Sequence, residues 1–212
     1  MQKLTTYEKR VLILLAIFYL VGIVLHVIPA TLPLMLLFTP YTLLATAVVG
    51  FFSERKNKSL IIWALATFLS TLTLEILGVQ TGLVFGSYGY GPTLGFGLLG
   101  VPLLIGINWT VIILGAITII EKRVSHPMAV ALITASFTVF FDWIMEPVAI
   151  AFDYWSWAGA AIPLQNYIAW FVIAFLFALL HQKMKIVPKN RIASAIVLIQ
   201  TVFFASLRLF AL

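Results

Sequence analysis

The stretch MAVALITASFTVFFDWIMEPVAIAF, residues 128–152, decides the fold of this chain. It holds no basic residue and only two acids, Asp142 and Glu146. A hydrocarbon core needs about 20 apolar residues of helix, so the stretch is long enough to span a bilayer. Pro147 leaves the carbonyl group of Trp143 without its helical partner. A membrane tolerates that only where the backbone is buried in protein or lines a cavity.

Six further stretches are of the same kind. Of the 212 residues, 63% are hydrophobic and 9% are charged, against about 25% charged in a soluble domain, so lipid must be the solvent. The first span is too long for a signal peptide, and no small-residue cleavage site follows it. We therefore predict an all-α polytopic integral membrane protein, one transmembrane domain over residues 1–212. The seven predicted spans are 8–28, 32–52, 59–80, 101–121, 128–152, 164–183 and 192–210.

The basic residues predict the orientation. Of the 13 Lys and Arg, all except Arg208 fall on one side of the predicted spans. The positive-inside rule then predicts a cytoplasmic N-terminus and an extracytoplasmic C-terminus, in the inner (cytoplasmic) membrane. The net charge of +6 is thus explained by topology, and no nucleic-acid partner is expected. The residues on the cytoplasmic side are Lys3, Lys9, Arg10, Arg55, Lys56, Lys58, Lys122, Arg123, Lys183, Lys185, Lys189 and Arg191.

The seven acids divide differently. Three lie among the cytoplasmic basic residues: Glu8, Glu54 and Glu121. The other four, Glu75, Asp142, Glu146 and Asp153, are predicted in the opposite half. At 1.5 Å per residue, Glu75 lies about 24 Å and Asp142 about 21 Å from the cytoplasmic ends of their helices. The spacing i, i+4, i+11 predicts one helical face for Asp142, Glu146 and Asp153.

The segments after Glu75 and Glu146 resemble each other, which predicts a parallel internal repeat about an axis along the membrane normal. Each runs from an outward-rising helix through an aromatic-x-aromatic loop into a helix that begins near a proline. Shared aromatic belts would explain the aromatic residues but not the matched glutamates. The first copy contains Gly78, Tyr88-Gly89-Tyr90, Pro102, Asn108 and Trp109. The second contains Ala149, Trp155-Ser156-Trp157, Pro163, Asn166 and Trp170.

An ionised acid inside a bilayer is costly, and such a residue is a functional candidate by default. Asp142, Glu146 and Glu75 are the predicted catalytic residues. The alternative is a structural ion pair, for which Arg208 and His26 are candidate partners. Asp153 fits a supporting site residue or a solvated loop acid equally well. Asn108 and Asn166 are candidates for positioning water or for hydrogen bonds between helices.

No cofactor is expected. The chain has no cysteine, no Glu-x-x-His pattern, no Asp-rich magnesium motif and no phosphate-binding glycine loop, so no metal site is predicted. The glycine-rich segment 81–100 is interpreted as a re-entrant cover or a flexible loop over the outer cavity.

Three runs carry a resemblance to a known family: Asp142-Trp143-Ile144-Met145-Glu146-Pro147, Tyr154-Trp155-Ser156-Trp157 and Ile162-Pro163-Leu164-Gln165-Asn166. With Glu75-Ile76-Leu77-Gly78 and Phe85-Gly86-Ser87-Tyr88-Gly89-Tyr90, they are similar to membrane-bound carotenoid biosynthesis proteins. These are carotenoid 1′,2′-hydratases of the bisanhydrobacterioruberin hydratase and γ-carotene 1′-hydroxylase type. The resemblance covers about residues 60–175.

The resemblance implies a lyase that adds water to the C1′=C2′ double bond of an acyclic (ψ) carotenoid end, without a cofactor. The substrate would be lipophilic and lie in the bilayer, and other carotenoid enzymes could be partners. One carboxyl would protonate the alkene and a second would take a proton from water. Which acid does which stays open. Aromatic faces could stabilise the carbocation; the candidates are Trp109, Trp143, Tyr88, Tyr90, Trp155, Trp157 and Trp170.

Two alternatives compete with this interpretation. A lycopene-cyclase-like isoprenoid cyclase or isomerase would use the same acid and cation, but its product would keep the mass of the substrate. A proton-coupled transporter would also carry acids and a repeat within the membrane. It requires polar residues along a full path, whereas the cytoplasmic halves of the predicted helices are nearly all apolar.

Overall fold

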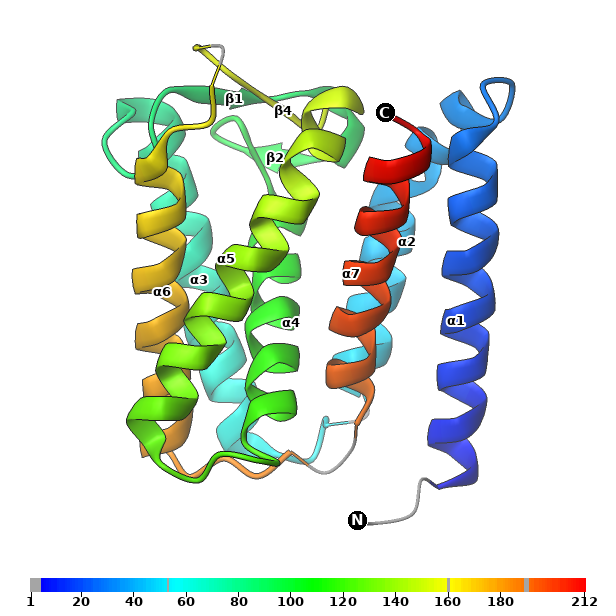
Figure 1. The fold of residues 1–212 in the computed structure, drawn as a ribbon. Helices are drawn as coiled ribbons and strands as arrows, with labels where there is room; N and C mark the ends of the chain where they lie inside the picture. The colour runs from blue at the N-terminus through cyan, green and yellow to red at the C-terminus, as the bar shows by residue number, and fades with distance from the viewer. Residues whose placement is uncertain (1–4, 53, 160, 189–190) are drawn as a thin grey trace.

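The computed structural model describes residues 5–52, 54–159, 161–188 and 191–212. Within them, seven helices run up and down in one bundle, with short strands gathered at one end (Figure 1). The helices are α1 (Thr6–Val27), α2 (Leu32–Phe52), α3 (Lys58–Thr81), α4 (Leu103–Ile120), α5 (Pro127–Ala151), α6 (Leu164–Lys183) and α7 (Ile192–Phe210).

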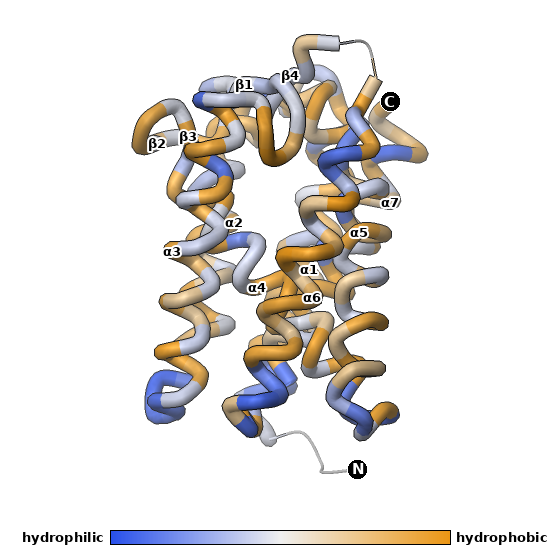
Figure 2. The backbone as a smooth tube through the Cα atoms, turned by 90° about the vertical axis from the view of Figure 1, so that its left-hand side faces the viewer, coloured by the Kyte–Doolittle hydropathy of each residue, from blue (hydrophilic) through white to orange (hydrophobic). Residues whose placement is uncertain are grey.

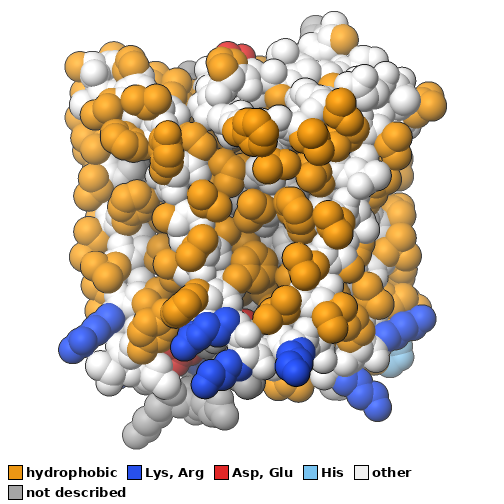
Figure 3. Space-filling model, turned by 180° about the vertical axis from the view of Figure 1, so that it is seen from behind, with side chains coloured by type: hydrophobic (Ala, Val, Ile, Leu, Met, Phe, Trp, Pro, Cys, Tyr) orange, Lys and Arg blue, Asp and Glu red, His pale blue; other side chains and the backbone are white. Residues whose placement is uncertain are grey.

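All seven described helices are long and apolar enough to cross a membrane, as predicted, and their bounds lie within two residues of the predicted spans. The chain is a multi-pass membrane protein. Hydrophilic backbone collects at the two ends of the tube in Figure 2, and Figure 3 shows Lys and Arg along one edge below an apolar belt. We call this end, with Arg55, Lys122 and Lys183, the basic end. Its predicted cytoplasmic location stays a prediction, and Lys3 and Lys189 lie outside the described residues.

Helix α4 is the centre of the bundle. Its apolar span is 72% buried, whereas that of α1 is only 11% buried. Large side chains of α4 such as Ile112, Ile113 and Ile117 are fully enclosed by neighbouring helices. Helix α1 lies at the edge and packs chiefly on α7 (Figure 1). Most of the surface of α1 is therefore left to lipid.

Helix α3 has a defined beginning and end. The Asn57 side chain accepts a hydrogen bond from the backbone N–H of Leu60 at 3.2 Å, which caps the first turn. Gly82 follows the last turn with a φ of +69°, and its N–H donates to the Gly78 carbonyl. This left-handed conformation suits glycine and stops the helix just beyond Glu75.

Helix α5 continues through Pro147 because another helix supplies the missing donor. Arg208 of α7 donates to the Trp143 carbonyl at 2.8 Å, the group that the proline leaves unpaired. The guanidinium also lies 4.2 Å from the centre of the Trp143 ring. The predicted role of Arg208 as counter-ion to the acids is wrong, since it serves the backbone of α5 instead.

The opposite end, which we call the aromatic end, is closed by strand pairs. β1 (Tyr88–Tyr90) pairs antiparallel with β4 (Trp155–Trp157), with Gly89 opposite Ser156. After a short 3-10 turn, η1 (Pro92–Leu94), β2 (Gly97–Leu98) pairs with β3 (Val101–Pro102). The glycine-rich segment therefore forms an ordered cover, which joins the two aromatic loops directly.

Candidate active site

Three carboxyl groups converge beneath β1 and β4. Glu75 of α3 and Asp142 and Glu146 of α5 are each at most 3% exposed. They line one small cavity of about 20 Å³, here the carboxylate cavity, which has room for about one water molecule. Its other lining residues are aromatic apart from one amide: Phe85, Tyr88, Tyr90, Trp109, Trp155, Trp157, Trp170 and Asn166.

Glu75 is held by the loop that follows its own helix. Its Oε2 accepts hydrogen bonds from the hydroxyl groups of Tyr88 and Tyr90, the latter at 2.7 Å. Gly78 makes this approach possible, because a Cβ there would lie 3.0 Å from the Tyr88 hydroxyl oxygen and 2.7 Å from the Phe85 ring. The close approach beside Glu75 is therefore made by aromatic side chains.

Burial raises the pKa of Tyr88 and of Tyr90 above the usual value, and negative charge on Glu75 raises them further. Both phenols therefore stay protonated in the physiological pH range. A phenolic hydroxyl can donate and accept, so this pair can bind Glu75 with or without a proton on its carboxyl group.

Glu146 also accepts two hydrogen bonds from the aromatic side chains of a strand, but the donors are indole N–H groups instead of hydroxyl groups. Its Oε2 accepts from the indole N–H groups of Trp155 at 3.0 Å and Trp157 at 3.1 Å. An indole N–H can only donate. Three donors aim at this carboxyl group, because the Asn166 amide nitrogen lies 3.3 Å from Oε1.

Asn166 joins the two acids of α5. The same amide nitrogen donates to Asp142 Oδ2 at 2.8 Å. Among the described residues it is the only group that hydrogen-bonds to the Asp142 carboxyl group. Asn166 thus bridges Asp142 and Glu146 by hydrogen bonds between α6 and α5, and its role in positioning water stays a prediction.

Aromatic rings form the remaining walls. Trp109 of α4 and Trp170 of α6 stack with centroids 3.6 Å apart, and Phe85 stacks on Trp170 at 5.2 Å. Across the strand pair, Tyr88 lies 5.0 Å from Trp157. These π faces border the acids on several sides, which is an arrangement that favours a cation in the cavity.

None of the described basic side chains pairs with the three acids. Arg208 binds the Trp143 carbonyl, and the Nδ1–H group of His26 donates to the Gly22 carbonyl of its own helix at 2.6 Å. His26 instead stacks on Phe152 beside a different cavity. The predicted role of His26 in an ion pair is therefore wrong, because α1 lies at the edge of the bundle.

Three further predicted residues lie outside the carboxylate cavity. Asp153 is exposed in the turn after α5, with a φ of +55°, because the helix ends at Ala151 and the predicted face ends with it. Asn108 faces Gln200, whose amide nitrogen lies 3.4 Å from the Asn108 oxygen. Trp143 is half exposed beneath Arg208. The other predicted aromatic residues all line the cavity.

Sequence reasoning missed Phe85 and the hydrogen-bonding role of the four loop aromatics. Phe85 lies three residues before Tyr88 in the quoted motif, and no pattern in the sequence indicates its stacking on Trp170. Within the described residues, no group of three or more His, Cys, Asp or Glu side chains is arranged to hold a metal ion. The lack of a cofactor stays a prediction.

Comparison with known proteins identifies the family. Residues 33–211, most of the chain, match the family model described as carotenoid biosynthesis protein. Bisanhydrobacterioruberin hydratase of Haloarcula japonica is 27% identical over 159 residues, which are 70% of this chain and 53% of that protein. The chain thus spans about half the length of this relative, and no solved structure matches it. The chain belongs to the carotenoid biosynthesis protein family.

Proposed function

We propose that this protein adds water to the C1′=C2′ double bond of an acyclic carotenoid end group in the cytoplasmic membrane. The observation that carries the proposal is the buried pair Asp142 and Glu146, bridged by Asn166 and without a basic partner among the described residues. Membership of the family and the seven apolar helices fit a lipophilic substrate that stays in the bilayer. The hydratase name of a relative supports the reaction type.

The hydrogen bonds favour different roles for the two acids. Glu146 receives bonds only from N–H donors, none of which can accept at the donating nitrogen, and this environment stabilises a carboxylate. Asp142 receives one bond at Oδ2, which leaves Oδ1 able to carry a proton. A second buried negative charge beside the first would be costly. We therefore assign Asp142 as the acid and Glu146 as the base.

The reaction then balances as follows. The Asp142 carboxyl group transfers its proton to C2′, the alkene π electrons form the new C–H bond, and a tertiary cation is left at C1′. Water attacks C1′ through its oxygen while the Glu146 carboxylate takes one of its protons. The product is the 1′-hydroxy end group, and transfer of the proton from Glu146 back to Asp142 restores the enzyme.

The aromatic walls support the cationic step. Trp109, Trp170, Trp155 and Trp157 present π faces or edges around the acids, and cation–π attraction is about 2 kcal/mol or more in a desolvated site. Glu75 with its two tyrosines adds a hydrogen-bonded wall opposite α5. The cavity has room for one water molecule, which is the second substrate of the proposed reaction.

Nothing favours the transporter alternative over hydration. Below the carboxylates, most of the fully buried side chains of α4 are apolar, including Ile112, Ile113 and Ile117. The two buried threonines of α4, Thr110 and Thr118, donate to carbonyl groups of their own helix. A proton pathway to the basic end would need polar groups or water along this route.

The test is to incubate purified protein with an acyclic carotenoid and to measure the product mass. Hydration adds one water per reacted end, whereas cyclisation leaves the mass unchanged. We expect a 1′-hydroxy product from the wild type and none from Asp142→Asn. Product of unchanged mass would contradict hydration and establish the cyclase alternative.

A further inference from the structure

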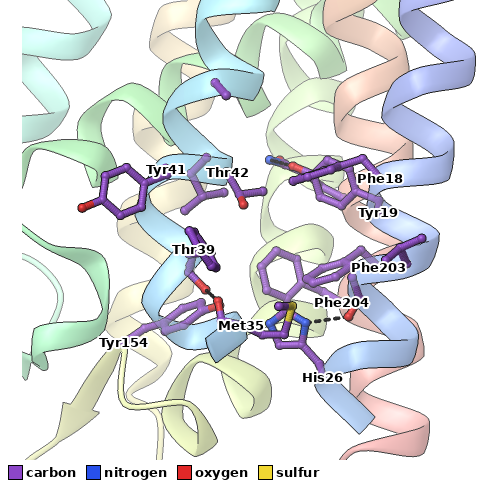
Figure 4. Close-up of a pocket in the computed structure, with 16 residues that line it drawn as sticks. Phe18, Tyr19, His26, Met35, Thr39, Tyr41, Thr42, Tyr154, Phe203 and Phe204 are labelled. Carbon is purple, nitrogen blue, oxygen red and sulfur yellow. Dashed lines mark hydrogen bonds between the residues drawn. The ribbon is translucent and has the colours of Figure 1, made fainter. Parts of the chain in front are cut away.

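A sizeable cavity lies away from the acids, between α1, α2 and α7 (Figure 4). We call it the lateral cavity. Its volume is about 420 Å³, within the range of ligand sites, whereas the carboxylate cavity measures about 20 Å³. Its wall runs along α1 from His26 to Phe18, about 12 Å at 1.5 Å per residue. The reacting centre alone is therefore too small for a carotenoid, whereas this cavity has room for part of a polyene chain.

The lateral cavity suits an apolar chain that arrives from lipid. Phe18, Phe38 and Tyr41 line it and are about half or more exposed on the lipid-facing surface. Most polar side chains in its wall bind each other: Gln200 donates to the Tyr19 hydroxyl at 3.2 Å, and the Tyr154 hydroxyl is hydrogen-bonded to Thr39 (Figure 4). Burial raises the pKa of Tyr154 to about 12, so no charge arises there near neutral pH.

A third cavity of about 20 Å³, here the linking cavity, lies between the lateral cavity and the acids. It is lined on one side by Leu43, Tyr154 and Phe204, which also line the lateral cavity. On its other side it is lined by Trp109 and Trp155, which also line the carboxylate cavity. Single layers of side chains thus separate three spaces in a row, and Trp155 is itself a hydrogen-bond donor to Glu146.

We infer that the lateral cavity holds the apolar polyene chain of the substrate while its end group passes the Tyr154–Trp155 wall to the acids. The inference rests on the proposed function for the identity of the ligand. It rests on the walls that the three neighbouring cavities share for the location. The polyene chain enters from the lipid between α1 and α2, the least buried of the described helices.

A second apolar groove provides an internal control. Its volume is about 370 Å³, and it lies between α2, α3 and α4, with Leu44, Ala64 and Phe68 in its wall. It shares no lining residue with the linking or carboxylate cavities. A ligand there would have no described route to the acids, so the two grooves are distinguished by connection and not by size.

The experiment fills each groove with the same side chain. Ala45 lines the lateral cavity and Ala64 lines the control groove, and neither touches the carboxylate cavity. Binding of an acyclic C40 carotenoid to detergent-solubilised wild type, Ala45→Trp and Ala64→Trp is followed by the polyene absorption band, and hydrated product is measured in parallel. We expect about tenfold weaker binding for Ala45→Trp, equivalent to about 1.4 kcal/mol, and less than twofold change for Ala64→Trp. The leucine pair, Ala45→Leu and Ala64→Leu, replaces the tryptophan pair if size-exclusion shows that either variant fails to fold.

The outcomes separate this inference from the proposed function. Equal binding and equal product in Ala45→Trp and wild type overturn the inference that the lateral cavity holds the polyene chain. They leave the proposed hydration unaffected. Carotenoid binding that is lost in Ala45→Trp, with no hydrated product from the wild type, supports the lateral cavity as the binding site and contradicts hydration. Native mass spectrometry that finds phospholipid in the wild type, undisplaced by carotenoid and lost in Ala45→Trp, assigns the cavity to lipid and overturns the inference.

Discussion

Glu75 and Glu146 occupy matching places in the two outward hairpins, yet their partners differ in one respect. Each accepts two hydrogen bonds at Oε2 from the aromatic-x-aromatic strand that follows its helix. For Glu75 the donors are tyrosine hydroxyls, and for Glu146 they are indole N–H groups. A hydroxyl accepts as well as donates, whereas an indole N–H only donates. The same backbone arrangement therefore accommodates Glu75 with or without a proton and favours the ionised form of Glu146.

The largest expected effect tests the α5 side of this comparison. Asp142→Asn removes the proton donor and Glu146→Gln removes the base, and general acid–base catalysis contributes about 10²–10⁴-fold. Hydrated product per minute should fall by that factor in each variant. Glu121→Gln is the matched control, since Glu121 lies at the basic end and binds Gln182. A Glu146→Gln variant that kept more than a tenth of the wild-type rate would remove Glu146 from the mechanism.

The next effect concerns the donors to Glu146. Trp155→Phe and Trp157→Phe keep an aromatic ring but lose the N–H group. A hydrogen bond to a charged group contributes about 1.5–3 kcal/mol, so we expect about 10–100-fold slower hydration. The measurement is kcat and KM with one carotenoid. A loss no larger than that of the corresponding tyrosine variants would show that Glu146 is not charged and would break the comparison.

A smaller effect is expected on the α3 side. Tyr88→Phe removes a hydroxyl that binds Glu75, and Glu75→Gln replaces the acid by a neutral side chain of the same shape. A hydrogen bond between neutral groups contributes about 0.5–1.5 kcal/mol, so the rate should fall less than about tenfold. Product formation under the same conditions is the readout. If Glu75→Gln were as inactive as Glu146→Gln, both glutamates would be essential and the assignment of roles would need to change.

The smallest effect belongs to Arg208. Arg208→Met removes the donor to the Trp143 carbonyl and the cation over the Trp143 ring. The expected loss is about 1 kcal/mol of stability, seen as a lower Tm in detergent, with hydration within twofold of wild type. A large loss of activity at unchanged Tm would instead restore the predicted role of Arg208 as counter-ion to the acids.

The helices and the three acids were predictable from sequence for a physical reason. Long apolar runs cannot be soluble, and a carboxyl group within one is rare enough to mark a site. The pairing of β1 with β4 was not predictable, because two three-residue strands 65 positions apart carry no pattern that names a partner. Arg208 shows the same limit. Sequence indicated which carbonyl Pro147 leaves unpaired, but not that α7 packs beside it.

Asp153 and Asn108 fit the second of their two predicted alternatives, a loop acid and a hydrogen bond between helices, for local reasons. The helical face was extended to Asp153 beyond Ala151, where the chain already turns. Asn108 precedes Trp109 in the helix, so when the tryptophan faces the acids its neighbour points elsewhere, toward Gln200. The predicted repeat remains a prediction, although Trp109 and Trp170, each seven residues after a proline, stack directly on each other.

The β1–β4 pair joins two parts of the chain, and each part carries some of the residues of the candidate site. Its register places Tyr88 opposite Trp157 and Tyr90 opposite Trp155, so exchanging the two strands reproduces the same pairing. Two identical hairpins would meet in this isologous way in a dimer. A cut in the 121–126 connection would leave Glu75 and its tyrosines on one fragment, and Asp142, Glu146 and Asn166 on the other. Each fragment would carry half a site, and activity would require their reassembly.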